Sequence, residues 1–97
     1  SLAEVDEMLF DSLPDRKSRF DVLDRYKHYM EAQLRKGVPL KRLARHLLGL
    51  FQGCPGGRRF RRHLSEHAHK EGAGLHLFDD ALGLVREPEF EAEPLDE

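Results

Sequence analysis

The stretch "RHLLGLFQGCPGGRRFRRHLSEHAHK", from Arg45 to Lys70, decides how this chain folds. Leucines recur at helical spacing in its first part, arginines surround a second apolar repeat in its last part, and "QGCPGG" separates the two. Proline fixes one backbone dihedral angle and glycine accepts angles that other residues avoid, so "QGCPGG" is typical of a sharp corner between two helices. A catalytic thiol and a phosphate cradle are the other two interpretations of this turn.

Two helices are predicted on either side of the corner. Residues 40–51 present a wide apolar face, and residues 57–70 place Phe60, Leu64 and Ala68 at the spacing of a buried stripe. The outward positions of both helices are mostly basic. They are Arg42, Arg45, His46 and Gly49 on the first helix, and Arg58, Arg59 and Arg62, with Arg61 on the flank, on the second.

Two further helices complete the predicted fold. A long one covers residues 19–36, with Ser18 as its N-cap and Gly37 as its C-cap, and a last one covers residues 75–85. Because no segment shows sustained alternation of apolar and polar residues, no strand is predicted. Four helices with short connections fold most simply as a compact antiparallel four-helix bundle, so the expected class is all-α.

The two ends of the chain differ from this central part. Residues 2–11 have the apolar spacing of the end of an amphipathic helix, and the chain starts without Met, as expected of a piece of a longer protein. Residues 87–97 are acidic, contain two prolines and show almost no apolar periodicity. We therefore expect a short N-terminal helical segment and a disordered acidic tail.

The formal net charge of −2 conceals a strong asymmetry. Residues 35–70 hold ten Lys or Arg and one acidic residue, for a charge of +9, whereas the rest of the chain carries −11. Although a charge run is usually a solvated helix face, this scarcity of acids favours a polyanionic partner. Arginine suits phosphate because its planar guanidinium donates two hydrogen bonds at once. The candidate phosphate-binding residues are Lys41, Arg42, Arg45, Arg58, Arg59, Arg61, Arg62 and Lys70.

A catalytic or metal site is a weaker interpretation of the same stretch. Cys54 is the only cysteine, so no internal disulfide can form and a reducing, cytoplasmic setting is expected. A nucleophilic thiol needs a base, but no acid is placed to orient His63 or His67. These histidines and His69 lack the paired cysteines typical of structural zinc. We therefore assign no catalytic, cofactor-binding or metal-binding residue, and no apolar run is long enough to span a bilayer.

The central stretch resembles the C-terminal segment of the bacterial A-type tRNA-dihydrouridine synthases. The pattern of that family reads approximately R-H-M-L-G-L-F-x-G-x-P-G-A-R-x-W-R-R-x-L-S-E-N-A-H-x-x-G-A. This chain departs from it with Gly57 for alanine, Phe60 for tryptophan and His67 for asparagine. The start, "LAEVDEMLF", is similar to the end of the family's barrel domain. The matching positions are Arg45, His46, Gly49, Leu50, Phe51, Gly53, Pro55, Gly56, Arg58, Arg61, Arg62, Leu64, Ser65, Glu66, Ala68 and His69.

The resemblance implies that catalysis and tRNA binding lie in different parts of the full-length enzyme. Members of the family join an FMN-binding (β/α)8 barrel to a helical domain that helps hold tRNA, and they reduce a uridine C5–C6 bond with flavin hydride supplied by NADPH. Residues 1–17 would then be the end of the barrel domain with a linker, residues 18–86 the tRNA-binding domain, and residues 87–97 a tail without counterpart. The catalytic cysteine belongs to the barrel, so Cys54 is expected to be structural.

The same resemblance sets the expected partners. They are tRNA and the enzyme's own barrel, with no membrane and no DNA. FMN and NADPH are implied for the full-length enzyme, not for this chain, which is expected to be inactive by itself.

Two other functions stay open. A basic face is also compatible with a protein-docking module. Two basic helices that meet at a glycine turn are compatible with a helix-turn-helix DNA-binding domain, although the five-residue corner argues against it.

Overall fold

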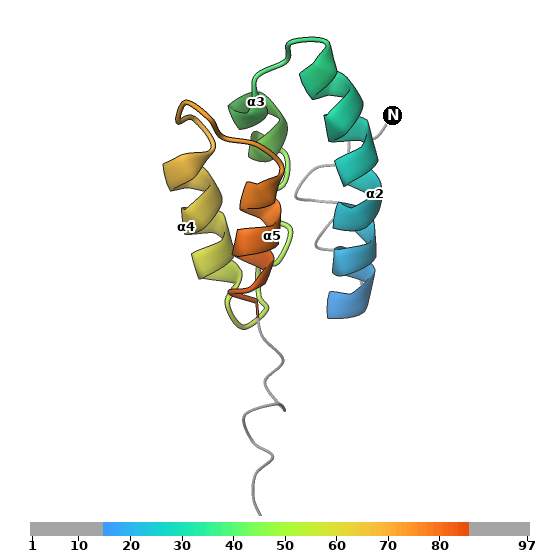
Figure 1. The fold of residues 1–97 in the computed structure, drawn as a ribbon. Coiled ribbons are helices and arrows are strands. Elements are labelled where there is room, and N and C mark those ends of the chain that lie inside the picture. The colour runs from blue at the N-terminus through green and yellow to red at the C-terminus, as the bar shows by residue number, and fades with distance from the viewer. Residues whose placement is uncertain (1–14, 86–97) are drawn as a thin grey trace, which may run out of the picture.

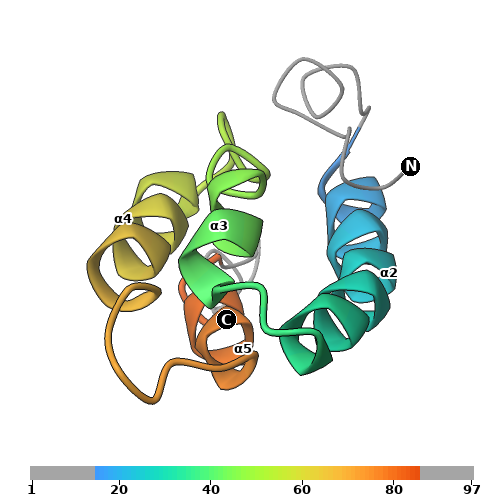
Figure 2. The same cartoon turned by 90° about the horizontal axis from the view of Figure 1, so that it is seen from above.

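The computed structural model describes residues 15–85, which form four helices and no strand. Neighbouring helices in the sequence run antiparallel, and α3 and α5 lie between α2 and α4 (Figures 1 and 2). The all-α class is therefore confirmed, whereas the segments predicted at 2–11 and 87–97 lie outside the described residues. The helices are α2 (Arg16–Arg35), α3 (Leu40–Arg45), α4 (Gly57–His67) and α5 (His76–Leu82).

Helix α2 begins earlier than predicted, because its N-cap is Asp15 and not Ser18. The Asp15 carboxylate accepts a hydrogen bond from the Ser18 N–H at 2.8 Å. This bond is the main cause that lowers the pKa of Asp15 below its usual 3.8. Both residue types are good caps, and the carboxylate also interacts favourably with the positive end of the helix dipole. At the other end Gly37 adopts a left-handed conformation, with φ of +93°, as expected of a glycine that closes a helix.

The single helix predicted over 40–51 is wrong in its second half. Helix α3 ends at Arg45, and the chain continues as turns in which N–H groups reach back three residues. At three residues per turn Leu47 and Leu50 fall on one side, and both are buried. Gly49, predicted to point outward, is buried as well. The N···O distances are 2.9 Å for Leu47–Ala44, 3.1 Å for Leu50–Leu47 and 3.0 Å for Gln52–Gly49.

The two C-terminal helices are shorter than predicted. Helix α4 ends at His67 instead of residue 70, and the turns that follow lead to Gly72, whose φ of +86° reverses the chain. Helix α5 ends at Leu82, and the chain continues to Val85 in turns in which N–H groups bond to the carbonyl three residues earlier. Its buried residues are Leu77, Phe78 and Ala81, whereas Leu75 and Leu82 are only half-buried.

Phe51 joins the helices at the centre of the core. Its side chain is fully buried, and its ring centroid lies 4.8 Å from that of Phe20 on α2 and 4.9 Å from that of Phe60 on α4. Aromatic pairs at such spacing contribute packing beyond their buried area. The stripe predicted on α4, which continues to Leu64 and Ala68, is buried as expected.

The "QGCPGG" corner packs against the segment that follows α5. A Cβ atom at Gly56 would overlap the Leu84 carbonyl, and one at Gly57 would overlap the Phe51 carbonyl. Gly56 also has φ of +86°, a conformation that favours glycine. The glycine pair therefore lets two backbone segments touch, and this contact determines where α4 begins.

Two arginines of α2 donate hydrogen bonds to the corner and to the segment that follows α5. Arg19 Nη1 donates to the carbonyl oxygens of Leu50, at 2.9 Å, and Gln52, at 3.2 Å. Arg16 Nη2 donates to the Val85 carbonyl at 2.8 Å. These carbonyls lie in turns and not inside an α-helix, where a backbone N–H would donate to each of them. The two guanidinium groups supply the missing hydrogen bonds.

We predict that Gly56→Ala destabilises the domain far more than Gly53→Ala. Both glycines have nearly the same φ, +86° and +85°, but nothing lies within 4 Å of a Cβ at Gly53. We expect Gly53→Ala to lower the free energy of unfolding by about 1 kcal/mol, the cost of a left-handed alanine. Gly56→Ala should lower it by at least about 3 kcal/mol, because its methyl group also overlaps Leu84. Urea denaturation measures both, and equal losses would contradict the role of the contact.

Loss of the Arg19 hydrogen bonds should also be measurable. We expect Arg19→Gln to lower the free energy of unfolding by about 2 kcal/mol, since two carbonyls lose a charged donor. Arg25→Gln, at an exposed position of the same helix, removes the same charge and should cost less than about 0.5 kcal/mol. If both variants denature at the same urea concentration, the Arg19 bonds contribute nothing to stability.

Tyr26 makes the stability sensitive to alkaline pH. Its hydroxyl is buried and has no hydrogen-bond partner within residues 15–85. Burial raises the pKa of Tyr26 to about 12, and the neighbouring Tyr29, with ring centroids 5.3 Å apart, adds to the shift. The folded state thus holds the proton more tightly than the unfolded chain, whose tyrosine has a pKa of 10.0. This contribution is complete below pH 10 and is lost as the pH rises toward 12.

We predict that Tyr26→Phe removes this alkaline loss. At neutral pH the substitution should change the free energy of unfolding by less than about 1 kcal/mol, because no hydrogen bond is broken. Urea denaturation at pH 8 and pH 11.5, each for wild type and variant, gives the difference. A Tyr29→Phe variant is the control and should keep most of the wild-type pH dependence; an equal alkaline loss in Tyr26→Phe would contradict the assignment.

Candidate nucleic-acid interface

All eight predicted phosphate-binding residues are exposed, and they lie on α3, on α4 or in the turn after α4. Helix α3 carries no acidic residue and α4 carries one, Glu66. Most exposed acids of residues 15–85 belong instead to α2 and α5, and α2 and α4 lie on opposite sides of the bundle (Figure 2). These acids are Asp21, Asp24, Glu31, Asp79 and Asp80. Helix α2 also carries six Lys or Arg, so within residues 15–85 the strongest excess of positive charge lies on α3 and α4.

Five of the eight basic residues line three neighbouring hollows, which run from the corner, past the junction of α3 and α4, to the turn after α4, and which we call the α3–α4 seam. Arg58 and Arg61 line the first hollow, near the corner. Lys41 and Arg45 line the second, of about 230 Å³. Lys41 and Lys70 line the third, of about 210 Å³. The first two hollows have Leu48 in common, and the second and third have Lys41, Ala68 and His69 in common.

The other three basic residues, Arg42, Arg59 and Arg62, line none of these hollows. On α4 this follows from helical spacing, because Arg58 and Arg61 are three residues apart and share one face. Arg59 and Arg62 share the next face, turned further outward. The structure thus brings five of the predicted residues together along one line and leaves three beside it.

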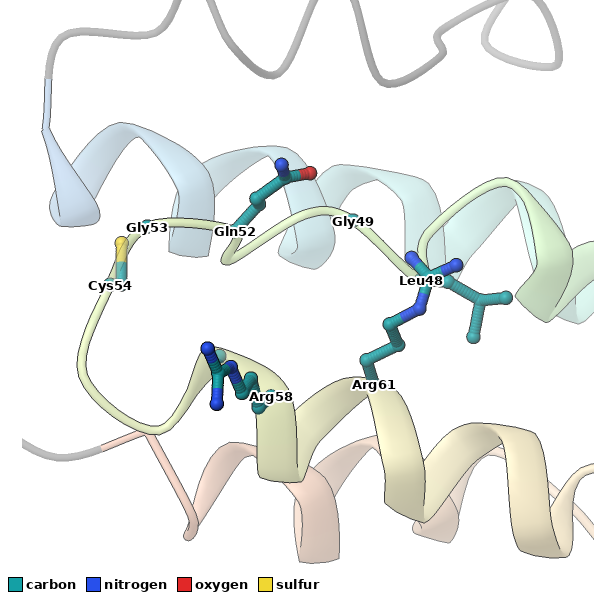
Figure 3. Close-up of a pocket in the computed structure, with 8 residues that line it drawn as sticks. Leu48, Gly49, Gln52, Gly53, Cys54, Arg58 and Arg61 are labelled. Atoms are coloured by element: carbon teal, nitrogen blue, oxygen red, sulfur yellow. The ribbon is translucent and has the colours of Figure 1, made fainter.

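The first hollow is the largest, with a volume of about 670 Å³. Arg58 and Arg61 rise from α4 toward residues 48–54, with Cys54 near one end and Leu48 near the other (Figure 3). Sequence reasoning treated these residues as a plain corner and missed the hollow. The clue was the series of glycines that precedes the arginines, since positions without side chains leave space. The lining residues are Leu48, Gly49, Gln52, Gly53, Cys54, Gly57, Arg58 and Arg61.

Within residues 15–85, most of these basic residues have no carboxylate partner. An ion pair between Lys27 and Asp79, at 2.7 Å, joins α2 and α5 away from the seam. Lys70 Nζ lies 3.2 Å from His67 Nδ1. In the described part of the chain, the residues without an ion-pair partner include Lys41, Arg42, Arg45, Arg58, Arg59 and Arg62.

The histidines of α4 contact each other. The rings of His63 and His67 lie 4.6 Å apart, and His63 Nε2 is buried with no hydrogen-bond partner among residues 15–85. Within the same residues, no three His, Cys, Asp or Glu side chains are placed to hold one metal ion. Cys54 is half-buried, and neither a histidine nor an acid lines its hollow.

The fold and the site define a class of protein: an all-α domain with exposed basic residues on α3, on α4 and in the turn after α4. The family follows from comparison with known proteins. The dihydrouridine synthase (Dus) family model matches residues 2–85, so this chain belongs to the dihydrouridine synthase family, as the resemblance predicted.

Three relatives illustrate the match, and each is a tRNA-dihydrouridine(20/20a) synthase. The protein of Vibrio parahaemolyticus is 49% identical over 84 residues, which cover 87% of this chain and 26% of the relative. That of Yersinia pestis is 42% identical over 91 residues, which cover 94% and 26%. That of Xanthomonas campestris is 53% identical over 68 residues, which cover 70% and 20%.

The chain thus spans about a quarter of the length of the curated relatives it matches. No solved structure matches it significantly. Among the helices of residues 15–85, none combines the length and the apolar character needed to cross a bilayer.

Proposed function

We propose that this chain is the tRNA-binding helical part of a tRNA-dihydrouridine synthase and that it holds tRNA through phosphate contacts. One observation carries the proposal. The eight predicted basic residues are exposed on α3, on α4 and in the turn after α4, and five of them line the hollows of one seam. The relatives are named for action on tRNA, which is a polyanion of the kind that such a surface fits.

The physical basis is electrostatic. Lysine and arginine that neutralise phosphates release counterions from the nucleic acid, and this release supplies affinity without reading the base sequence. Guanidinium groups add paired hydrogen bonds to phosphate oxygens. In this proposal the helical part orients the tRNA and does not choose the uridine.

The redox step belongs to the rest of the enzyme in this proposal. A barrel that binds FMN would reduce uridine with hydride supplied by NADPH, and this chain alone would leave uridine unchanged. The barrel and tRNA are then the two partners of the chain, and the cytoplasm is where they meet.

We predict that tRNA binding to this chain weakens steeply with salt. Five phosphate contacts imply a slope of about −4 in a plot of log K against log salt concentration, which is a loss of roughly 250-fold between 50 and 200 mM salt. Fluorescence anisotropy of labelled tRNA measures this slope. Binding that does not change with salt would contradict the proposal.

Two controls belong to this experiment. Arg58→Glu, Arg59→Glu and Arg62→Glu together should abolish binding and leave the helical circular dichroism unchanged, because all three side chains are exposed. Duplex DNA of similar length should bind more weakly than tRNA; the opposite order would support the helix-turn-helix alternative. Competition between the barrel and tRNA for the basic face would support the protein-docking alternative.

A further inference from the structure

The α3–α4 seam is narrow for a surface that binds a whole duplex. Its three hollows follow one another from the corner, past the junction of α3 and α4, to the turn after α4, and adjacent hollows share lining residues. Lys41, Arg45, Arg58 and Lys70 lie along this one line, with Arg61 beside Arg58. A single line of cations matches one sugar-phosphate strand, whereas a duplex presents two strands separated by a groove.

The first hollow is larger than a phosphate contact requires. Its volume of about 670 Å³ falls within the roughly 300–1,000 Å³ of pockets that enclose small molecules. Arg58 and Arg61 border it on one side, and Leu48 provides apolar surface next to positions 49 and 53, which have no side chains. Such a hollow combines donors for a phosphate with an apolar wall and guanidinium planes, on which a base can stack.

An unpaired nucleotide has both parts that this hollow can contact, a phosphate and a flat base with a free edge. In a duplex the bases are stacked inside, so a duplex would leave the hollow empty. The chemistry of the lining thus distinguishes between the two forms of RNA.

We propose that an unpaired strand of the bound RNA runs along the α3–α4 seam and inserts one nucleotide into the hollow between α4 and residues 48–54. Arg58 and Arg61 hold the phosphate of that nucleotide, and Leu48 contacts its base. Arg45, Lys41 and Lys70 contact phosphates further along the strand. This inference rests on the proposed function, since it takes tRNA as the ligand.

The three basic residues outside the seam provide a matched control. The triple variant Lys41→Gln, Arg45→Gln, Arg58→Gln and the triple variant Arg42→Gln, Arg59→Gln, Arg62→Gln each remove three exposed positive charges from α3 and α4. We expect the seam variant to bind tRNA at least about 30-fold more weakly and to reduce the salt slope by about 2. The other variant should also weaken binding, but by no more than about fivefold, because its three residues add to the basic field without lining the hollows. Circular dichroism and urea denaturation check that both remain folded.

Cys54 reports on the hollow without any substitution, because it lines the hollow and is the only cysteine of the chain. We expect its alkylation by iodoacetamide to become about tenfold slower when tRNA is present at ten times its Kd. Duplex RNA at equal occupancy should leave the rate unchanged. The seam variant should lose the protection by tRNA at the same concentration, and the other triple variant should keep it.

The outcomes separate this inference from the proposed function. If both triple variants weaken tRNA binding equally, the seam has no special role, and the inference fails while tRNA binding stands. If tRNA binds through the seam but Cys54 stays fully reactive, or if duplex RNA protects it equally, no nucleotide enters the hollow. If neither variant nor salt affects binding, the proposed function fails as well.

Discussion

The backbone of Gly56 lies against the Leu84 carbonyl, and that of Gly57 lies against the Phe51 carbonyl, so closely that neither position has room for a Cβ atom. This contact determines where α4 starts relative to the segment before it and to the end of α5. Because α4 starts there, Arg58 and Arg61 face residues 48–54 across a hollow. The arrangement of the basic surface thus depends on a packing constraint in which no charged side chain takes part.

Arginine has two different roles in this domain. Arg16 and Arg19 donate hydrogen bonds to carbonyls of turns that α2 packs against, and the Arg16 guanidinium also lies 5.0 Å from the centroid of the Phe20 ring. Arg58 and Arg59, by contrast, are exposed and have no ion-pair partner among the described residues. The first pair stabilises the corner, and the second pair contributes to the field around α4. A count of basic residues does not distinguish these roles, because both use the same donor groups.

The distribution of charge over the four helices relates the fold to the family of the chain. A formal net charge near zero would suggest weak attraction to nucleic acid, yet α3 and α4 together carry seven Lys or Arg and one acid, whereas α2 is mixed and α5 carries two acids. A field with a direction orients a polyanion as well as attracting it. This arrangement supports the proposal that the helical part positions tRNA while another part of the enzyme performs the reaction.

The sequence by itself determined the helical class, the position of the corner and the identity of the exposed cations, because these follow from apolar spacing and backbone chemistry over a few residues. The stripe through Phe60 and Leu64 is an example, since a helix buries one face whatever lies opposite. Only the tertiary structure decided that α3 ends at Arg45 and which arginines face the seam. Those outcomes depend on contacts between residues far apart in the chain, such as Arg19 with Leu50 and Gly56 with Leu84. The spacing of apolar residues predicts which face of a helix is buried, but it does not predict which segment of the chain packs against that face.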